Sequence, residues 1–486
     1  MSKEIKLLDD CYVKNKDKCE IFFVWVKDKV FLIISILVFF LSFFMFNRYG
    51  ATLNPLKLNV FSYIFWYQLV VLSFFAAIIM IYNIDGNHHW MGRAGENARL
   101  LGWFSVLWTM LMLPLGLAIG FLLLSIKSGP RLFEYYCNKQ FQTIFSEKDK
   151  LIKIIIHIFF FVSIMSTIYT FRVIGTIPLI NAIRSPGEAA MLAVMRIEAT
   201  REFAGNTLIR NFGSIFLAQL ISYTAYGYYR LTKNMSDRIF FCFSLIHAII
   251  AVTYNLARTP FIFFLIGLMF IKIFIDGRIK KKFFILTVIL ALSGVVGATL
   301  LTVGTNDIRT LLFTHNDGIL GRIILSQASG NFMSFEIFPQ TMDHLGIRSV
   351  SRWLPSLFGM EHSERAMRLI MIYVNPGGVE AGTVNVMNSL FIGEAWANFG
   401  LAGFIFSPLI VGFVIGVIFA IFLKSRKTPL YIGMLGYLSI FLGNTITGGF
   451  MEYFYPVFII IVISIFLSIK YLAVFLSTSI IMNRKV

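Results

Sequence analysis

Long apolar runs separated by short polar stretches follow one another along almost the whole chain. Each run has about the length that crosses a bilayer as a helix, and strict alternation of apolar and polar residues, which is typical of strands, is absent from them. The pattern predicts an all-α polytopic membrane protein with about 11 (10–12) transmembrane helices. The runs lie at 30–46, 61–82, 100–126, 152–171, 211–228, 239–257, 260–275, 283–303, 400–423, 430–448 and 456–477.

The connections between the runs predict how the chain is organised. Most are short, which predicts one bundle, and the long outer region 304–399 is the exception; such a loop is usually functional. Within the outer loops we expect an amphipathic helix at Gly187–Gly205, a helix at Ile319–Phe338 and another at Ser363–Tyr373 with a serine cap. The predicted parts are a charged tail (1–29), a transmembrane bundle (30–303) with an outer loop (172–210), a large outer loop (304–399) and C-terminal transmembrane helices (400–486).

Composition agrees with a membrane protein. Hydrophobic residues make up 57% of the chain and charged residues only 14%, more apolar surface than a soluble domain of this size needs. A net charge of +18 is compatible with nucleic-acid binding, but the distribution of lysine and arginine follows the two sides of the membrane. We therefore expect no nucleic-acid partner. The four cysteines have neither metal spacing nor an evident pairing and are expected to be ordinary thiols.

Charge in the connections predicts the orientation. The basic turn "DGRIKKK" (276–282) belongs in the cytoplasm by the positive-inside rule, and the Lys-rich connections 127–153, 229–238 and 424–427 then fall on the same side. The outer connections are 172–210, 258–260 and 304–399.

The N-terminal third does not follow this rule. If every run crosses, the tail with its seven lysines lies outside. The alternative is that one segment does not cross: 100–126 contains Pro114, Gly116 and Gly120 and could form a re-entrant hairpin. The sequence leaves both open.

Lysine and arginine separate between the two faces over residues 127–486. The inner segments, counted with the "NRKV" tail (483–486) and the flanking Lys272 and Lys470, hold 14 Lys and 6 Arg, whereas the outer segments hold no Lys and 12 Arg: Arg172, Arg184, Arg196, Arg201, Arg210, Arg258, Arg309, Arg322, Arg348, Arg352, Arg365 and Arg368. Guanidinium is planar, stays protonated and binds phosphate or carboxylate through two parallel hydrogen bonds. The separation predicts an outward-facing site for a polyanionic substrate. The alternative is that these arginines pair with the outer acids Glu188, Glu198, Glu202, Glu361 and Glu364.

Arg258 is the most unusual of these cations. It stands between two short apolar runs and is followed by Thr259 and Pro260. Proline suits the first turn of a helix, and a helix N-terminus favours an anion. An ionisable residue at such depth is a functional candidate, against the alternative of an arginine that extends to the membrane surface from a plain turn.

Several motifs together resemble the O-antigen polymerases, the Wzy-type oligosaccharide repeat-unit polymerases, which are related to the O-antigen ligases. These motifs are "NPLKLNVFSYIFWY" before the second run, "FRVIGTIPLI" after the fourth, "ARTPF" at an outer turn and "GEAWANFGLAGF" before the ninth. The resemblance covers most of the chain as architecture. It implies a GT-C-like bundle in the bacterial inner membrane, with 304–399 as a large periplasmic loop and the active site facing the periplasm.

The implied activity is metal-independent glycosyl transfer without a cofactor. The growing chain passes en bloc from undecaprenyl diphosphate to the next lipid-linked repeat unit, and a chain-length regulator protein is an implied partner. We expect the diphosphate to be bound by Arg258, Arg172, Arg322, Arg196, Arg201 and Arg348, because arginines can neutralise it without a metal ion.

The acceptor hydroxyl also needs a general base within hydrogen-bond reach. Glu394 is the first candidate, because "FIGEAWANFG" places it at the membrane boundary near Asn398; His344 and His362 follow, since histidine titrates near neutral pH. Each has a structural alternative, such as capping a helix or pairing with an arginine.

Two other functions remain open from the sequence. A flippase for the same lipid-linked sugar would also use arginines, but such transporters usually have two related halves, and no internal repeat is visible here. An O-antigen ligase shares the donor and differs only in the acceptor.

Overall fold

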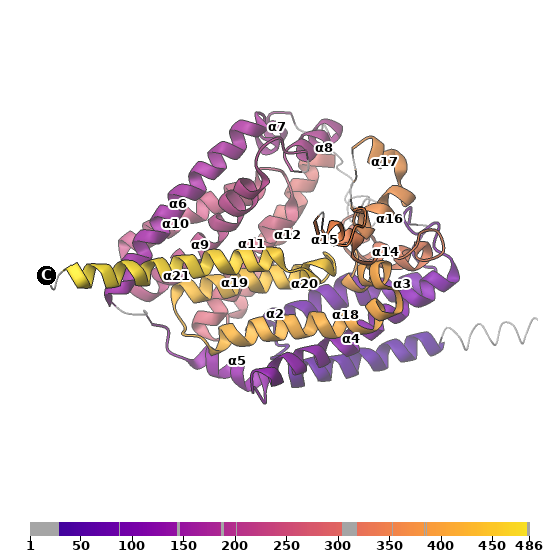
Figure 1. The fold of residues 1–486 in the computed structure, drawn as a ribbon, viewed down its shortest axis with the longest axis horizontal. Coiled ribbons are helices and arrows are strands. Elements are labelled where there is room, and N and C mark those ends of the chain that lie inside the picture. The colour runs from indigo at the N-terminus through magenta and orange to yellow at the C-terminus, as the bar shows by residue number, and fades with distance from the viewer. Residues whose placement is uncertain are drawn as a thin grey trace, which may run out of the picture.

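The computed structural model describes residues 29–86, 88–142, 146–185, 189–200, 202–303, 318–351, 353–382, 384 and 386–483. The described residues form a bundle of long helices that run along the longest axis of the molecule (Figure 1). The first described helix is Lys29–Tyr49. It is followed by η1 (Pro55–Lys57), α2 (Val60–Tyr63), the π-helix η2 (Ile64–Phe74), α3 (Phe75–Ile81), α4 (Glu96–Leu123), α5 (Gly129–Asn138), α6 (Ser146–Ile174), α7 (Pro178–Arg184), α8 (Ala189–Glu198), the π-helix η3 (Ile209–Phe216), α9 (Leu217–Thr232), α10 (Met235–Thr253), α11 (Arg258–Asp276), α12 (Lys281–Val303), α14 (Ile319–Ile337), η4 (Gly346–Ser349), α15 (Trp353–Ser356), α16 (Ala366–Val374), α17 (Pro376–Glu380), α18 (Phe391–Lys424), α19 (Pro429–Asn444), α20 (Met451–Phe454) and α21 (Val457–Asn483).

Several of these helices can cross a membrane, as the apolar pattern predicts. Seven described helices have the necessary length and composition, and two shorter apolar helices, Pro429–Asn444 and Val457–Leu472, accompany them. The chain is therefore an all-α, multi-pass membrane protein. Each of the eleven predicted runs coincides largely with helix, but the number of crossings stays a prediction. The seven are Lys29–Tyr49, Val60–Ile81, Glu96–Leu123, Lys150–Ile174, Met235–Thr253, Thr259–Asp276 and Phe391–Lys424.

Helices α4 and α18 pack backbone against backbone through glycine. A Cβ on Gly116 would stand 2.3 Å from the carbonyl oxygen of Leu409, and one on Gly412 would stand 2.2 Å from that of Leu113. Gly120 and Gly416 continue the contact one helical turn further on. Small residues four apart let helices approach closely, which strengthens dispersion contacts where the hydrophobic effect contributes little. We call these four glycines the glycine seam.

The continuity of α4 answers one point that the sequence left open, the re-entrant hairpin considered for 100–126. Helix α4 is continuous over 28 residues with Pro114 inside it, and the structure contains no re-entrant hairpin in this described segment. Proline cannot donate to the carbonyl four residues earlier, and that carbonyl, of Met110, instead accepts the Ser42 hydroxyl at 2.7 Å. Proline and glycine here serve close helix packing, and the side of the membrane on which the N-terminal tail lies stays a prediction.

The Lys-rich connections gather at one end of the bundle, as predicted. Arg230 in the last turn of α9 pairs with Asp276, the last residue of α11, at 2.7 Å. Lys427, between α18 and α19, donates to the carbonyl oxygens of Cys137 on α5 and Ile275 on α11, at 2.8 and 3.3 Å. We call this end the basic end.

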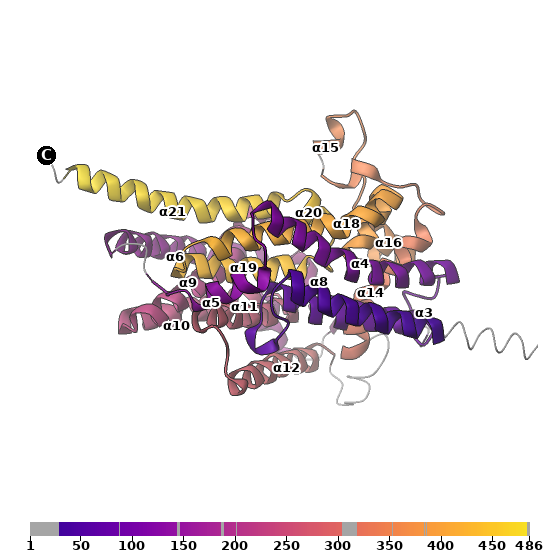
Figure 2. The ribbon, with the colours of Figure 1, turned by 90° about the horizontal axis from the view of Figure 1, so that it is seen from below.

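Helices α15, α16 and α17 lie at the other end, which we call the cap end (Figures 1 and 2). The predicted amphipathic helix within Gly187–Gly205 is present as α8, and the predicted helix at Ile319–Phe338 is present as α14. Helix α14 packs on α4 and α18, where Asn331 donates to the Ser105 hydroxyl at 2.8 Å. The predicted serine cap at Ser363 is wrong: α16 begins at Ala366 with Arg365 at the N-cap and no side-chain cap.

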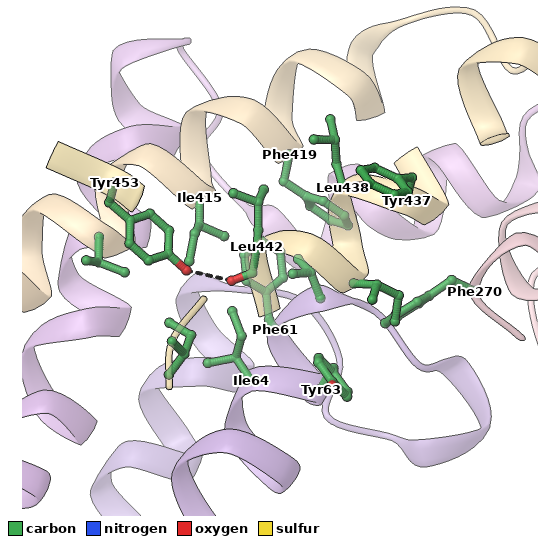
Figure 3. Close-up of a cluster of buried hydrophobic side chains, with 14 of the residues drawn as sticks. Phe61, Tyr63, Ile64, Phe270, Ile415, Phe419, Tyr437, Leu438, Leu442 and Tyr453 are labelled. Atoms are coloured by element: carbon green, nitrogen blue, oxygen red, sulfur yellow. Dashed lines mark hydrogen bonds between the residues drawn. The ribbon is translucent and has the colours of Figure 1, made fainter. Parts of the chain in front are cut away.

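The core at the middle of the bundle is made of side chains from α2, η2, α11, α18 and α19 (Figure 3). Phe61 packs edge-on against Phe419, with ring centroids 4.8 Å apart. The hydroxyl of Tyr453 donates to the Leu442 carbonyl oxygen at 2.6 Å, which fastens α20 to the end of α19. The chain between these two helices is thereby held at the edge of the core.

Candidate functional site at the cap end

Glu394 lies in the first turn of α18, and only 2% of it is exposed. Its Oε2 accepts the backbone N–H of Met451 at 3.1 Å. Gly449 passes so close that a Cβ on it would stand 2.4 Å from that oxygen, and its φ of +137° also favours glycine. The carboxylate therefore fixes the turn between α19 and α20. As predicted, Glu394 lies near Asn398, whose amide donates to its carbonyl oxygen at 2.8 Å.

A bend at Gly400 divides α18 into a short stretch before it and a long one after it. Gly400 has a φ of +57°, and a Cβ there would stand 2.9 Å from Nε2 of His344. His344 also meets the Trp396 ring edge-on, with centroids 5.4 Å apart. The bend thus makes room for His344, and the imidazole packs against the start of α18.

The structure brings the other predicted catalytic residue, His362, and Arg348 to the same place. Nδ1 of His362 lies 3.0 Å from the carbonyl oxygen of Arg348. The Arg348 guanidinium donates to the carbonyl oxygens of His344 and Leu345, each at 3.2 Å. All three predicted catalytic residues and one predicted arginine therefore surround η4 and the start of α18.

A cavity of about 440 Å³ opens beside this group, between α9, α11, α19, α20 and α21. Its walls are mainly aromatic and aliphatic side chains, and its polar groups come from Gln219, Asn444, Thr445 and Glu452. Gly448, next to the glycine that touches Glu394, also lines it. The full lining is Gln219, Pro260, Phe263, Tyr437, Ile440, Phe441, Asn444, Thr445, Gly448, Glu452 and Phe458.

Glu452 is the carboxylate that lines the cavity, and Arg365 at the N-cap of α16 binds it. Two guanidinium nitrogens each approach Oε1 of Glu452 at 3.2 Å. Among the residues that the structure describes, none donates to Oε2. The Glu452 side chain is 27% exposed, and so one of its oxygens remains available to a ligand.

Polar side chains inside the bundle hold the end of α19 beside the cavity. The Tyr63 hydroxyl and the Gln68 amide, from α2 and η2, both donate to Oδ1 of Asn444. Thr447 donates to Oε1 of Gln68 at 2.8 Å. Buried polar groups of this kind are costly unless they are satisfied, and a satisfied network fixes one geometry.

The structure places the predicted diphosphate-binding arginines in different positions. Arg258 is the first residue of α11, two residues before Pro260 in the cavity wall, and Pro260 lies in the first turn as predicted. The Arg258 side chain and Arg201 lie outside the described residues. Arg172 is exposed in the last turn of α6, and no described contact links it to the cavity.

Arg196 on α8 and Arg322 on α14 are close enough to repel each other. Burial and, second, the Arg322 charge lower the pKa of the Arg196 guanidinium from its usual value. A nearby like charge disfavours the protonated form, as burial does. These two cations come from the separate outer loops 172–210 and 304–399.

Sequence reasoning missed Glu452, Asn444 and Gln219 as site residues. The signal was present in "GNTITGGFMEYFY", a polar and glycine-rich stretch between two apolar runs, from Gly443 to Tyr455. It was passed over because the predicted runs 430–448 and 456–477 absorbed or bordered it.

Among the described residues, no group of three or more His, Cys, Asp or Glu side chains could hold a metal ion. Comparison of the chain with protein-family models, with curated proteins and with solved structures gave no match.

Proposed function

We propose that the protein is an inner-membrane glycosyltransferase that polymerises undecaprenyl-diphosphate-linked oligosaccharide repeat units at the periplasmic face. The growing chain is transferred en bloc to a new repeat unit. One observation carries the proposal: a cavity lined mainly by aromatic and aliphatic side chains contains a carboxylate, Glu452, that is bound by an arginine and still has one available oxygen. A lipid-linked sugar needs this combination of apolar walls, cation and proton acceptor.

Each group has a role in the reaction. Oε2 of Glu452 accepts the proton of the acceptor hydroxyl as its oxygen bonds to the anomeric carbon of the donor. The bond from that carbon to the diphosphate oxygen breaks, and the electron pair leaves with undecaprenyl diphosphate. Arg365 and the N-terminal end of α11, where Arg258 stands, stabilise the charge that develops on the leaving group.

Glu394 takes a positioning role. Its carboxylate is buried against the Met451 N–H and does not line the cavity, but it fixes the turn that places Glu452. His344, which packs in the bend of α18, supports the same stretch from the other side.

The test is the substitution Glu452→Gln in a strain that lacks the chromosomal gene. Glutamine keeps the volume and removes the proton acceptor, so we expect polymer formation to fall by about 10²–10⁴-fold. Lipopolysaccharide gels would then show chains of a single repeat unit. The matched control is Glu364→Gln, an exposed carboxylate of the cap end, which should give full-length polymer.

The same gels separate the alternatives. A flippase or a ligase defect would remove the O-chain altogether, whereas a polymerase defect leaves one repeat unit attached. Normal polymer from Glu452→Gln, at equal protein in the membrane, would contradict the assignment of Glu452.

A further inference from the structure

Two adjoining hollows lie at the basic end, where α9 turns into α10. The first, of about 290 Å³, is lined by Tyr229, Arg230, Lys233, Met235 and Arg238. The second, of about 360 Å³, is lined by Met235, Arg238, Ile239, Cys242, Phe243 and Ile246. They share Met235 and Arg238, so a cationic hollow continues directly into an apolar one. We call the two together the α10 groove.

The cationic part has more positive charge than its own acids neutralise. Arg230 and Lys272 both bind Asp276 at 2.7 Å, and Lys153 binds Asp237 at 2.7 Å. Lys233 and Arg238 form no ion pair with any residue that the structure describes, and both are exposed. Five cations thus surround two carboxylates, and the two uncompensated cations line the first hollow.

The apolar part follows one face of α10. Met235, Ile239, Phe243 and Ile246 recur at helical spacing, and between 46% and 64% of each side chain is exposed. Helix α10 is among the candidate membrane spans, so this face meets hydrocarbon where the cations meet the head-group layer. An occupant needs an anionic head and an acyl chain in one molecule.

We propose that the α10 groove binds an anionic phospholipid of the leaflet at the basic end. Its phosphate lies between Lys233 and Arg238, and one acyl chain follows Ile239, Phe243 and Ile246. Basic pockets beside transmembrane helices recognise anionic head groups in this way. The site lies at the end of the bundle opposite to the cap, so it stands independently of the proposed glycosyl transfer.

Native mass spectrometry of the full-length protein, released from detergent with added phosphatidylglycerol or phosphatidylcholine, tests the proposal. We expect phosphatidylglycerol to bind in preference to phosphatidylcholine. The double variant Lys233→Gln/Arg238→Gln should bind phosphatidylglycerol roughly tenfold more weakly. Its control is Lys280→Gln/Lys281→Gln, which removes the same charge from the exposed chain at the start of α12 and should leave binding unchanged.

A further variant tests the apolar half. Ile246→Asn keeps every cation of the groove, and we expect it to weaken phosphatidylglycerol binding while protein yield and melting temperature stay those of the wild type. If Lys233→Gln/Arg238→Gln and Lys280→Gln/Lys281→Gln weaken phosphatidylglycerol binding equally, the proposal is overturned, because the overall positive charge of this end would then account for binding. Competition by glycerol phosphate as effective as that by the intact lipid would overturn it as well, because a free phosphate would then be sufficient.

Discussion

At the scale of single residues, the proposed site contains two carboxylates in different surroundings. Glu394 stands out in the sequence because it precedes Asn398 at the start of an apolar run, whereas the polar stretch that contains Glu452 is hidden between two predicted apolar runs. The structure distinguishes them by exposure: the first is enclosed by the Met451 N–H and Gly449, and the second faces a cavity. Burial of that kind depends on residues some 50 positions away along the chain, and no local pattern reports it.

The turn over Glu394 gives a test at this scale. Gly449→Ala places a methyl group against Oε2 and strains a φ of +137°, so we expect a loss of about 1–3 kcal/mol in unfolding free energy. Differential scanning fluorimetry of the purified protein measures it as a lower melting temperature.

A second substitution distinguishes the methyl clash from a general weakness of the turn. Glu394→Gln in the otherwise wild-type protein keeps an oxygen for the Met451 N–H and should retain most of the stability. Glu394→Ala, added to Gly449→Ala, removes the oxygen that the new methyl group meets, so it should recover part of the lost stability. If the stability losses of Gly449→Ala and Glu394→Ala simply add in the double variant, the contact between residues 449 and 394 does not contribute to the loss.

At the scale of elements, the helices were largely predictable and their packing was not. Apolar runs of adequate length define a span because each backbone polar group must be satisfied inside the bilayer. Pro114, Gly116 and Gly120 of α4 are compatible with a hairpin and also with close packing against another helix. The sequence does not distinguish the two, because the partner glycines on α18 lie about 300 residues away. Only the structure joins the two halves of the glycine seam.

The glycine seam makes the element-scale prediction. Gly412→Ala sets a Cβ 2.2 Å from the Leu113 carbonyl oxygen, so α4 and α18 must separate. We expect a loss of about 1–3 kcal/mol, as for overpacked cores, with lower yield from membranes. Gly297→Ala on α12 is the matched control, because a Cβ there meets nothing within 4 Å, and its melting temperature should not fall.

At the scale of the whole molecule, the sequence separated the two ends by the type of cation. The Lys-rich connections do meet at the basic end, which follows from the strength of the positive-inside signal. The arginines of the outer connections, in contrast, were treated as one site. The structure distributes them: Arg348 binds backbone carbonyls, Arg365 binds Glu452, and Arg196 approaches Arg322. The abundance of arginine therefore predicted that these residues share one face, but it did not predict that each has a different binding partner.

Cysteine labelling in intact cells tests the orientation. In a Cys11→Ser/Cys19→Ser/Cys242→Ser background we expect Glu380→Cys at the cap end to react with a membrane-impermeant maleimide, and Lys280→Cys at the basic end to react only after permeabilisation. Native Cys137 gives little background because burial raises its thiol pKa to about 11, and the reactive thiolate is scarce below that pH. Labelling of Lys280→Cys from outside would reverse the assignment of the two faces.

The bend at Gly400 divides α18 into two parts that make different contacts. Before the bend it holds Glu394, and after it the same helix is clamped to α4 by the glycine seam. Any tilt that the long part adopts to match hydrocarbon thickness is therefore passed on to the carboxylate and to the turn above it. We therefore expect the rate of the proposed glycosyl transfer in vesicles to vary with acyl-chain length even when the sugar substrate is held constant.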